Sequence, residues 1–126
     1  AIRSLALEAL RHLAVCAENK VEMWQDTHGV RAAAVEAARL ALPAHGASRE
    51  HALALLQNLA MEPRNREPMW RASSGVREAL IAAAQLKSPA DRRARLYAVV
   101  ALQKLADAAA NKRTMWDDTS PAHAGG

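Results

Sequence analysis

The chain has 126 residues, of which 51% are hydrophobic but only 3% are aromatic, and it contains no phenylalanine. Its core must therefore be built from alanine, leucine and valine, which suits closely packed helices and argues against a β-sandwich or a β-barrel. The charges, which sum to +4, are interspersed apart from one basic cluster, DRRAR at 91–95, so solvated helix faces are favoured over nucleic-acid binding.

The first predicted element is a helix over residues 2–17, where apolar residues recur at helical spacing. Ile2, Leu5, Leu7 and Leu10 present apolar surface at once, with no N-cap residue before them. Apolar surface left in water forfeits about 25 cal/mol per Å² of stabilisation. We therefore expect this helix to be covered, either by an upstream repeat or by another subunit.

A short helix is predicted next, and it contains the hexamer NKVEMW at 19–24. Its residues Asn19 and Glu22 have the spacing of a capping box. Related hexamers, NREPMW at 65–70 and NKRTMW at 111–116, recur at intervals of 46 residues, and all three tryptophans of the chain close this hexamer. A period of this length is typical of solenoids and other repeat arrays.

The 46-residue period divides the chain into units. Residues 1–118 are predicted to form a single array, and residues 119–126 a flexible C-terminal tail. The array comprises a partial repeat (1–18), two full repeats (19–64 and 65–110) and a second partial repeat (111–118).

The middle of the chain is predicted to contain a long helix and then a short one. The long helix covers 49–61, with Ser48 as its cap and a break at Glu62-Pro63-Arg64. Its apolar residues recur at helical spacing and are Ala52, Leu53, Leu56, Leu59 and Ala60. Asn65 is then placed to cap the short helix over 66–72.

A further helix follows the turn ASSG and is expected to end near residue 87. Its inner face is marked by Val76, Leu80, Ala83 and Ala84. In KSPAD at 87–91, Ser88 is the predicted cap of the next helix, with Pro89 in first position and Asp91 in the first turn.

The segment ALALLQNLAMEPRNREPMWRASSGVREALIAAAQL (52–86) resembles the armadillo family, and more broadly the armadillo and HEAT α-solenoids. The Asn-basic-x-x-Met-Trp signature indicates a divergent subfamily. The resemblance implies an all-α fold, a right-handed superhelix of three-helix repeats with a 46-residue period. It also implies that the long third helix of each repeat lines a concave wall on which partner peptides lie.

The repeated signature is predicted to be structural. It consists of Asn19, Met23, Trp24, Asn65, Met69, Trp70, Asn111, Met115 and Trp116. Each asparagine is expected to cap a short helix, and each tryptophan to fill the core between stacked repeats. An aromatic ladder that stacks against a ligand is the alternative, and a buried indole N–H would need an acceptor.

No residue pattern indicates an enzyme. Cys16 has only His12 as a local candidate base, and a thiol nucleophile needs such a base. The five histidines form no HxxxH or HExxH pair, and the chain has no glycine-rich phosphate loop. We therefore predict no catalytic residues, no metal and no cofactor.

Outside the core positions, residues of the three long helices form matched sets at the 46-residue period. The sets are Glu8/Ala54/Val100, Arg11/Gln57/Gln103 and His12/Asn58/Lys104. By the resemblance, Asn58 matches the family's peptide-clamping asparagine. The tryptophan that accompanies it in nuclear-import receptors is replaced by Ala54, so recognition of basic import signals is not supported. The predicted partner-binding residues are Arg11, His12, Gln57, Asn58, Gln103 and Lys104.

The predicted function is a non-catalytic interaction or scaffolding module that binds a protein or an extended peptide through its concave face. Two alternatives stay open, a structural subunit of a large assembly and an RNA-binding α-solenoid. No apolar run reaches the length of a membrane span, so membrane insertion is not expected. A single cysteine and a start without signal-peptide features favour an intracellular, cytoplasmic location.

Overall fold

The computed structural model describes residues 2–25, 29–40, 43–71, 75–108 and 111, and these form helices joined by turns, with no strand among them. The α-helices are α1 (Ile2–Leu13), α2 (Ala17–Gln25), α3 (Val30–Ala38), α4 (Gly46–Ala60), α5 (Pro63–Arg71), α6 (Val76–Ala84) and α7 (Arg92–Ala106). Two 3-10 turns, η1 (Pro43–His45) and η2 (Pro89–Asp91), precede α4 and α7. The prediction of an all-α fold is confirmed. The predicted tail (119–126), Met115 and Trp116 lie outside the described residues.

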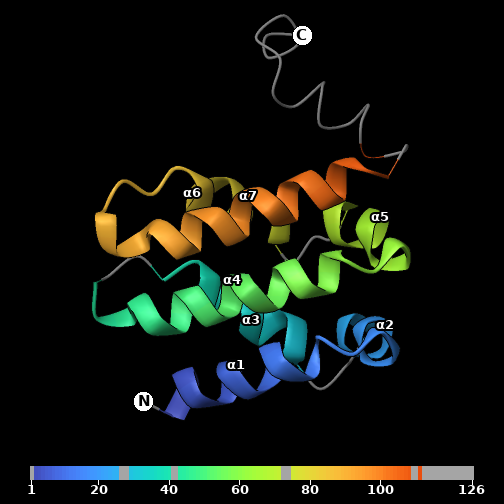
Figure 1. Ribbon diagram of the computed structural model, residues 1–126, viewed down its shortest axis with the longest axis horizontal. Coiled ribbons are helices and arrows are strands. Elements are labelled where there is room, and N and C mark those ends of the chain that lie inside the picture. Colours follow the sequence, from blue (N-terminus) through green and yellow to red (C-terminus); the bar gives the residue numbers. More distant parts are fainter. Residues whose placement is uncertain (1, 26–28, 41–42, 72–74, 109–110, 112–126) are drawn as a thin grey trace, which may run out of the picture.

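The long helices α1, α4 and α7 lie side by side in one layer, with α4 in the middle (Figure 1). Behind this layer, α3 packs against α4 and α6 packs against α7. The short helices α2 and α5 contact each other at one end of the layer, on the right in Figure 1. Segments far apart in the chain thus become neighbours in a regular order.

Corresponding helices begin and end at the same interval along the chain. α2 and α5, α3 and α6, and α4 and α7 are each offset by 46 residues at both ends. Gly29 and Gly75 lie just before α3 and α6, with φ angles of 102° and 90°. Glycine adopts this left-handed conformation without the steric cost that other residues incur. The repeated glycine is therefore required by the backbone at both turns.

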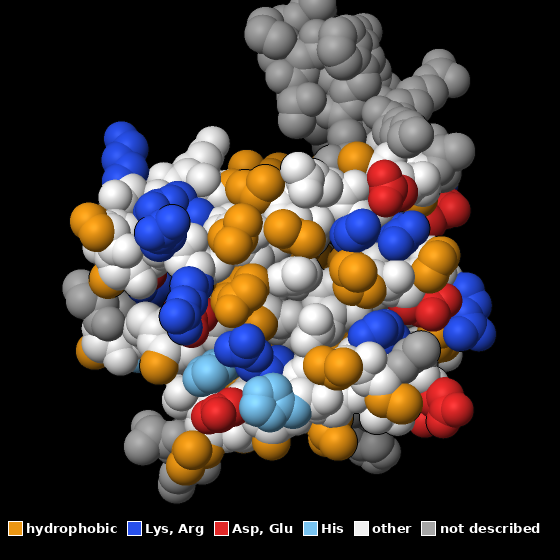
Figure 2. Space-filling model, viewed as in Figure 1, with side chains coloured by type: hydrophobic (Ala, Val, Ile, Leu, Met, Phe, Trp, Pro, Cys, Tyr) orange, Lys and Arg blue, Asp and Glu red, His pale blue; other side chains and the backbone are white. Residues whose placement is uncertain are grey.

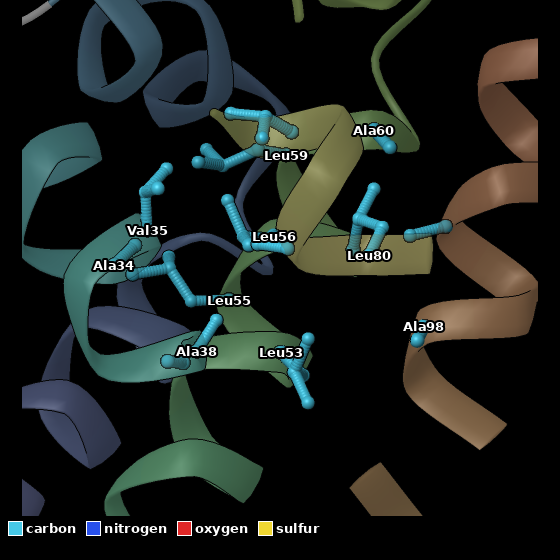
Figure 3. Packing of buried hydrophobic residues seen from close by; sticks show 14 of the residues in the cluster. Ala34, Val35, Ala38, Leu53, Leu55, Leu56, Leu59, Ala60, Leu80 and Ala98 are labelled. Atoms are coloured by element: carbon cyan, nitrogen blue, oxygen red, sulfur yellow. The ribbon is translucent and has the colours of Figure 1, made fainter. Parts of the chain in front are cut away.

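The core lies around α4. Its predicted apolar residues, Ala52, Leu53, Leu56, Leu59 and Ala60, are all completely buried. Figure 3 shows leucines of α4 between alanines and Val35 of α3 and Leu80 of α6, with Ala98 of α7 nearby. Small alanines let the helices approach closely, so leucine can fill the remaining space without phenylalanine.

Three predicted helix starts, at Ser48, Asn65 and Asn19, are wrong. Ser48 does not cap α4, because η1 leads directly into the helix at Gly46 and Ser48 lies within it. Asn65 does not cap α5, because the helix already begins at Pro63. Proline is favoured in the first helical position. The segment Glu62-Pro63-Arg64, which was expected only to end α4, therefore also starts α5.

Asn19 also lies inside its helix, since α2 begins at Ala17, and the predicted first helix ends earlier, at Leu13. By contrast, the Ser88 hydroxyl does act as a cap. It accepts a hydrogen bond from the Ala90 N–H of η2 at 3.3 Å. Ser88 therefore starts the 3-10 turn, and α7 follows it.

Candidate functional site

The signature asparagine joins three helices. The Asn65 side-chain amide donates hydrogen bonds to the carbonyl oxygens of Leu59 on α4 and Lys20 on α2, both at 2.9 Å. Asn111 makes the matching bonds, to Leu105 on α7 at 2.9 Å and to Arg66 on α5 at 2.8 Å. Leu59 and Leu105 lie near the ends of α4 and α7, where carbonyls have no partner within the helix. The asparagine therefore connects the long helix before it to the short helix of the preceding unit.

We expect Asn65→Ala to lower the free energy of unfolding by about 2–3 kcal/mol, because it removes two hydrogen bonds from a buried site. Asn19→Ala is the matched control. Asn19 is half-buried and bonds the Leu13 carbonyl at 2.9 Å in an exposed setting, so its loss should cost about 1 kcal/mol or less. Urea unfolding of both variants measures the difference. Equal losses would contradict the connecting role.

The signature tryptophans are buried beneath arginines. Trp24 and Trp70 are 2% and 1% exposed, which confirms their predicted burial. The guanidinium of Arg31 lies 5.3 Å from the Trp24 ring, and that of Arg77 lies 5.1 Å from the Trp70 ring. A cation over an indole face is attracted by the ring quadrupole. The recurring Gly-Val-Arg triplet therefore provides the turn and the arginine that covers the ring.

The charged residues around the first signature are held by local structure. The ammonium group of Lys20 is buried and donates a hydrogen bond to the Ala14 carbonyl at the end of α1. Burial lowers the pKa of Lys20, an effect that Cys16 and Glu62 oppose. Hydrogen bonds from the side chain and backbone of Arg64 lower the pKa of Glu62. Lys20 thus joins α2 to the end of α1, whereas the contact between Arg64 and Glu62 is local to the start of α5.

The six residues predicted to bind a partner lie on the three long helices. They are Arg11 and His12 on α1, Gln57 and Asn58 on α4, and Gln103 and Lys104 on α7. His12 and Gln103 are exposed, and the other four are half-buried. We call the side of α1, α4 and α7 that Figure 2 presents the front face, where basic, histidine and hydrophobic side chains lie together. The matched set Glu8/Ala54/Val100 is less accessible, since Ala54 is buried.

Arg11 links all three long helices. One guanidinium nitrogen lies 3.0 Å from Nδ1 of His51 on α4, and another donates to the Tyr97 hydroxyl on α7 at 3.3 Å. The guanidinium also lies 5.4 Å from the centroid of the Tyr97 ring. Because arginine can only donate, Nδ1 of His51 must be the acceptor. On the other side of the ring, Nε2 of His51 lies 3.9 Å from a carboxylate oxygen of Glu8.

Asn58 is oriented by α1. Its amide nitrogen donates a hydrogen bond to the Arg11 carbonyl at 2.9 Å. Of the six predicted residues, Arg11 and Asn58 are thus directly joined. His51 and Tyr97 were not among the predicted residues, although they too occupy matched positions 46 residues apart on α4 and α7. The matched spacing was the signal that could have identified them.

A second arginine contact was also not predicted from the sequence. Arg49 of α4 is 3% exposed and lies 2.5 Å from the carboxylate of Asp91, which precedes α7. It also donates to the Leu40 carbonyl at 2.5 Å. Arg95, at the matching position of α7, donates to the Leu86 carbonyl at 2.9 Å and to the Ser88 carbonyl. Arginine recurs at positions 3, 49 and 95, at the 46-residue interval, and this recurrence could have identified the position from the sequence.

The described part of the chain offers no group of three His, Cys, Asp or Glu side chains that could hold a metal ion. None of the helices in the described ranges is long and apolar enough to cross a membrane. Comparison with protein-family models, with curated proteins and with solved structures finds no match to this chain.

Proposed function

We propose that this chain is an armadillo-like α-solenoid that acts as a non-catalytic protein-interaction module. In this proposal the 46-residue unit is the repeat of a right-handed superhelix, and the front face is its concave wall. The observation that carries the proposal is the parallel placement of α1, α4 and α7. Three long helices of successive units form one continuous face with polar and apolar side chains across it (Figure 2).

The front face suits an extended peptide. Matched residues on neighbouring long helices provide contacts at regular spacing, and an extended chain presents backbone groups at regular spacing too. His12, Gln103 and Lys104 offer polar contacts on α1 and α7. Figure 2 shows hydrophobic side chains beside these polar ones on the same face. Combined polar and apolar contacts are typical of protein interfaces.

Asn58 is the central polar residue of this proposed binding face. A side-chain amide has two N–H donors and an acceptor oxygen. One donor bonds the Arg11 carbonyl at 2.9 Å and thereby holds the amide in one orientation. A peptide backbone would meet the remaining donor and acceptor, which match a backbone C=O and N–H.

The test begins with a random-peptide phage library selected against the whole chain. We expect selected peptides to bind with micromolar affinity, measured by fluorescence anisotropy. The triple variant His12→Ala, Gln103→Ala and Lys104→Ala should bind them about tenfold more weakly, a loss of about 1.4 kcal/mol.

The control is the double variant Arg64→Ala and Arg71→Ala on α5. Both arginine side chains are highly exposed, at 72% and 73%, and lie outside the three long helices. This variant should bind the peptides as the parent chain does. Peptides that lose binding to the α5 variant but keep it with the front-face variant would contradict the proposal.

A further inference from the structure

The imidazole ring of His51 on α4 contacts two oppositely charged residues of α1. Its Nδ1 lies 3.0 Å from a guanidinium nitrogen of Arg11, and its Nε2 lies 3.9 Å from a carboxylate oxygen of Glu8. Glu8 and Arg11 are three residues apart, so both reach the ring from one side of α1. The His51 side chain is 17% exposed, and water can therefore exchange protons with the ring.

The two contacts require different protonation states of the ring. Because a guanidinium only donates, Nδ1 can accept from Arg11 only while it carries no proton, which places the single proton of the neutral ring on Nε2. The imidazolium ion carries a proton on both nitrogens, so it offers Arg11 no acceptor and repels its charge. The same ion attracts the Glu8 carboxylate. The ring therefore bonds Arg11 when it is neutral and pairs with Glu8 when it is charged.

The neighbouring long helices bring further titratable and charged groups toward the ring. On α1, His12 is exposed and directly follows Arg11. On α7, the Tyr97 hydroxyl accepts from Arg11 at 3.3 Å, with Arg93 one turn before it and Lys104 two turns after it on the same side of the helix. Among the described residues, however, only Arg11 and Glu8 contact the ring nitrogens of His51.

The other elements around α4 lie at its start, behind it or at its far end. At the start of α4, η1 contributes His45, and η2 contributes Asp91, which is paired with Arg49. α3 packs behind α4, and α2 and α5 lie at the opposite end from η1 (Figure 1). The choice between the two contacts of His51 is therefore made on the side of α4 that meets α1.

We propose that His51 is a pH-dependent switch that exchanges Arg11 for Glu8. In the neutral state the ring accepts from Arg11, which is held between α4 and Tyr97 of α7. Histidine side chains ordinarily take up their second proton between about pH 8 and pH 5. On protonation the ring releases Arg11 and pairs with Glu8, so α1 stays bound to α4 while the guanidinium gains a free N–H donor. This switch does not depend on the proposed binding of a peptide.

NMR spectroscopy of the full chain labelled with ¹⁵N tests the exchange directly. At the alkaline end of the titration we expect the His51 ring to carry its proton on Nε2. On acidification the side-chain signals of Arg11 should shift with the same midpoint as those of the His51 ring. A neutral ring with its proton on Nδ1, or Arg11 signals that do not follow His51, overturns the proposal.

Two variants that remove a charge should move the midpoint of the His51 titration in opposite directions. Glu8→Gln removes the attraction on the imidazolium ion and should lower the midpoint by about half a pH unit. Arg11→Gln removes the repulsion and should raise it by a similar amount. Shifts in the same direction, or no shift in either variant, overturn the switch. If circular dichroism shows Arg11→Gln unfolded, Arg11→Met removes the same charge and keeps a long side chain.

Glu50→Gln is the matched control. It removes the same charge as Glu8→Gln from the residue that precedes His51 on α4. Consecutive residues of a helix do not face each other, so this variant should change the midpoint of the His51 titration clearly less than Glu8→Gln does. An equal change would show that any nearby carboxylate has the same effect, and would overturn the assignment of Glu8 as the partner of the charged ring.

Discussion

Replacing Trp70 by alanine is expected to lower the free energy of unfolding by about 3–5 kcal/mol, the range typical of large aromatic residues removed from a core. Trp70 is 1% exposed and carries the Arg77 guanidinium 5.1 Å from its ring. The alanine variant loses the transfer free energy of the ring, leaves a cavity and removes the surface on which Arg77 lies. Urea unfolding with a linear extrapolation measures the loss.

Trp70→Phe separates the ring from the indole N–H. Within the described structure Nε1 of Trp70 is buried and has no hydrogen-bond partner. Phenylalanine removes that polar atom and keeps an aromatic face for Arg77, so its loss should be clearly smaller than that of alanine. A stability of Trp70→Ala equal to that of the parent chain would contradict the core role of the signature tryptophan.

Arg49→Ala is expected to destabilise the chain by about 3–5 kcal/mol, because it leaves the Asp91 carboxylate buried without its cation. The two side chains are 4% and 11% exposed and 2.5 Å apart. The ion pair joins α4 to the start of α7, and the Leu40 carbonyl also loses a donor. Chemical unfolding of the single variants and of the double variant with Asp91→Ala measures the coupling. The double variant should lose less than the sum of the two single losses.

Arg95→Ala is the matched control, since Arg95 occupies the position of Arg49 on α7. Arg95 is half-buried and bonds two carbonyls, and neither bond is in a fully buried setting. Its removal should cost about 1 kcal/mol. If Arg49→Ala and Arg95→Ala lose the same free energy, the buried ion pair does not make the contribution that its geometry indicates.

Burial of the core was readable from the sequence because it depends on local periodicity. Leu53, Leu56 and Leu59 recur at the spacing that brings side chains to the inner surfaces of a helix, and all three are completely buried. The same argument applies to Trp24 and Trp70, whose identical position in a repeated hexamer predicted equivalent buried sites. The chain's low aromatic content likewise predicted closely packed helices.

The hydrogen-bond partners of the signature asparagine could not be predicted from local sequence. Its position before a predicted short helix favoured a cap, in which the side-chain oxygen accepts a hydrogen bond from the helix. In the structure the Asn65 amide nitrogen instead donates to two carbonyls, one of them 45 residues away on α2. Which groups an asparagine meets depends on the helices that pack around it, and local sequence does not specify these.

The polar residues of the long helices show the same contrast between what local sequence predicts and what packing decides. Helical spacing in the sequence alone placed Arg11, Asn58 and Lys104 on three long helices. Only the tertiary structure showed that Arg11 contacts His51 and Tyr97, 40 and 86 residues away, and that Asn58 holds the Arg11 carbonyl. Sequence periodicity determines which side of a helix is apolar. The partners of each polar group are decided only when the helices pack, because hydrogen bonds require donor and acceptor within about 3 Å.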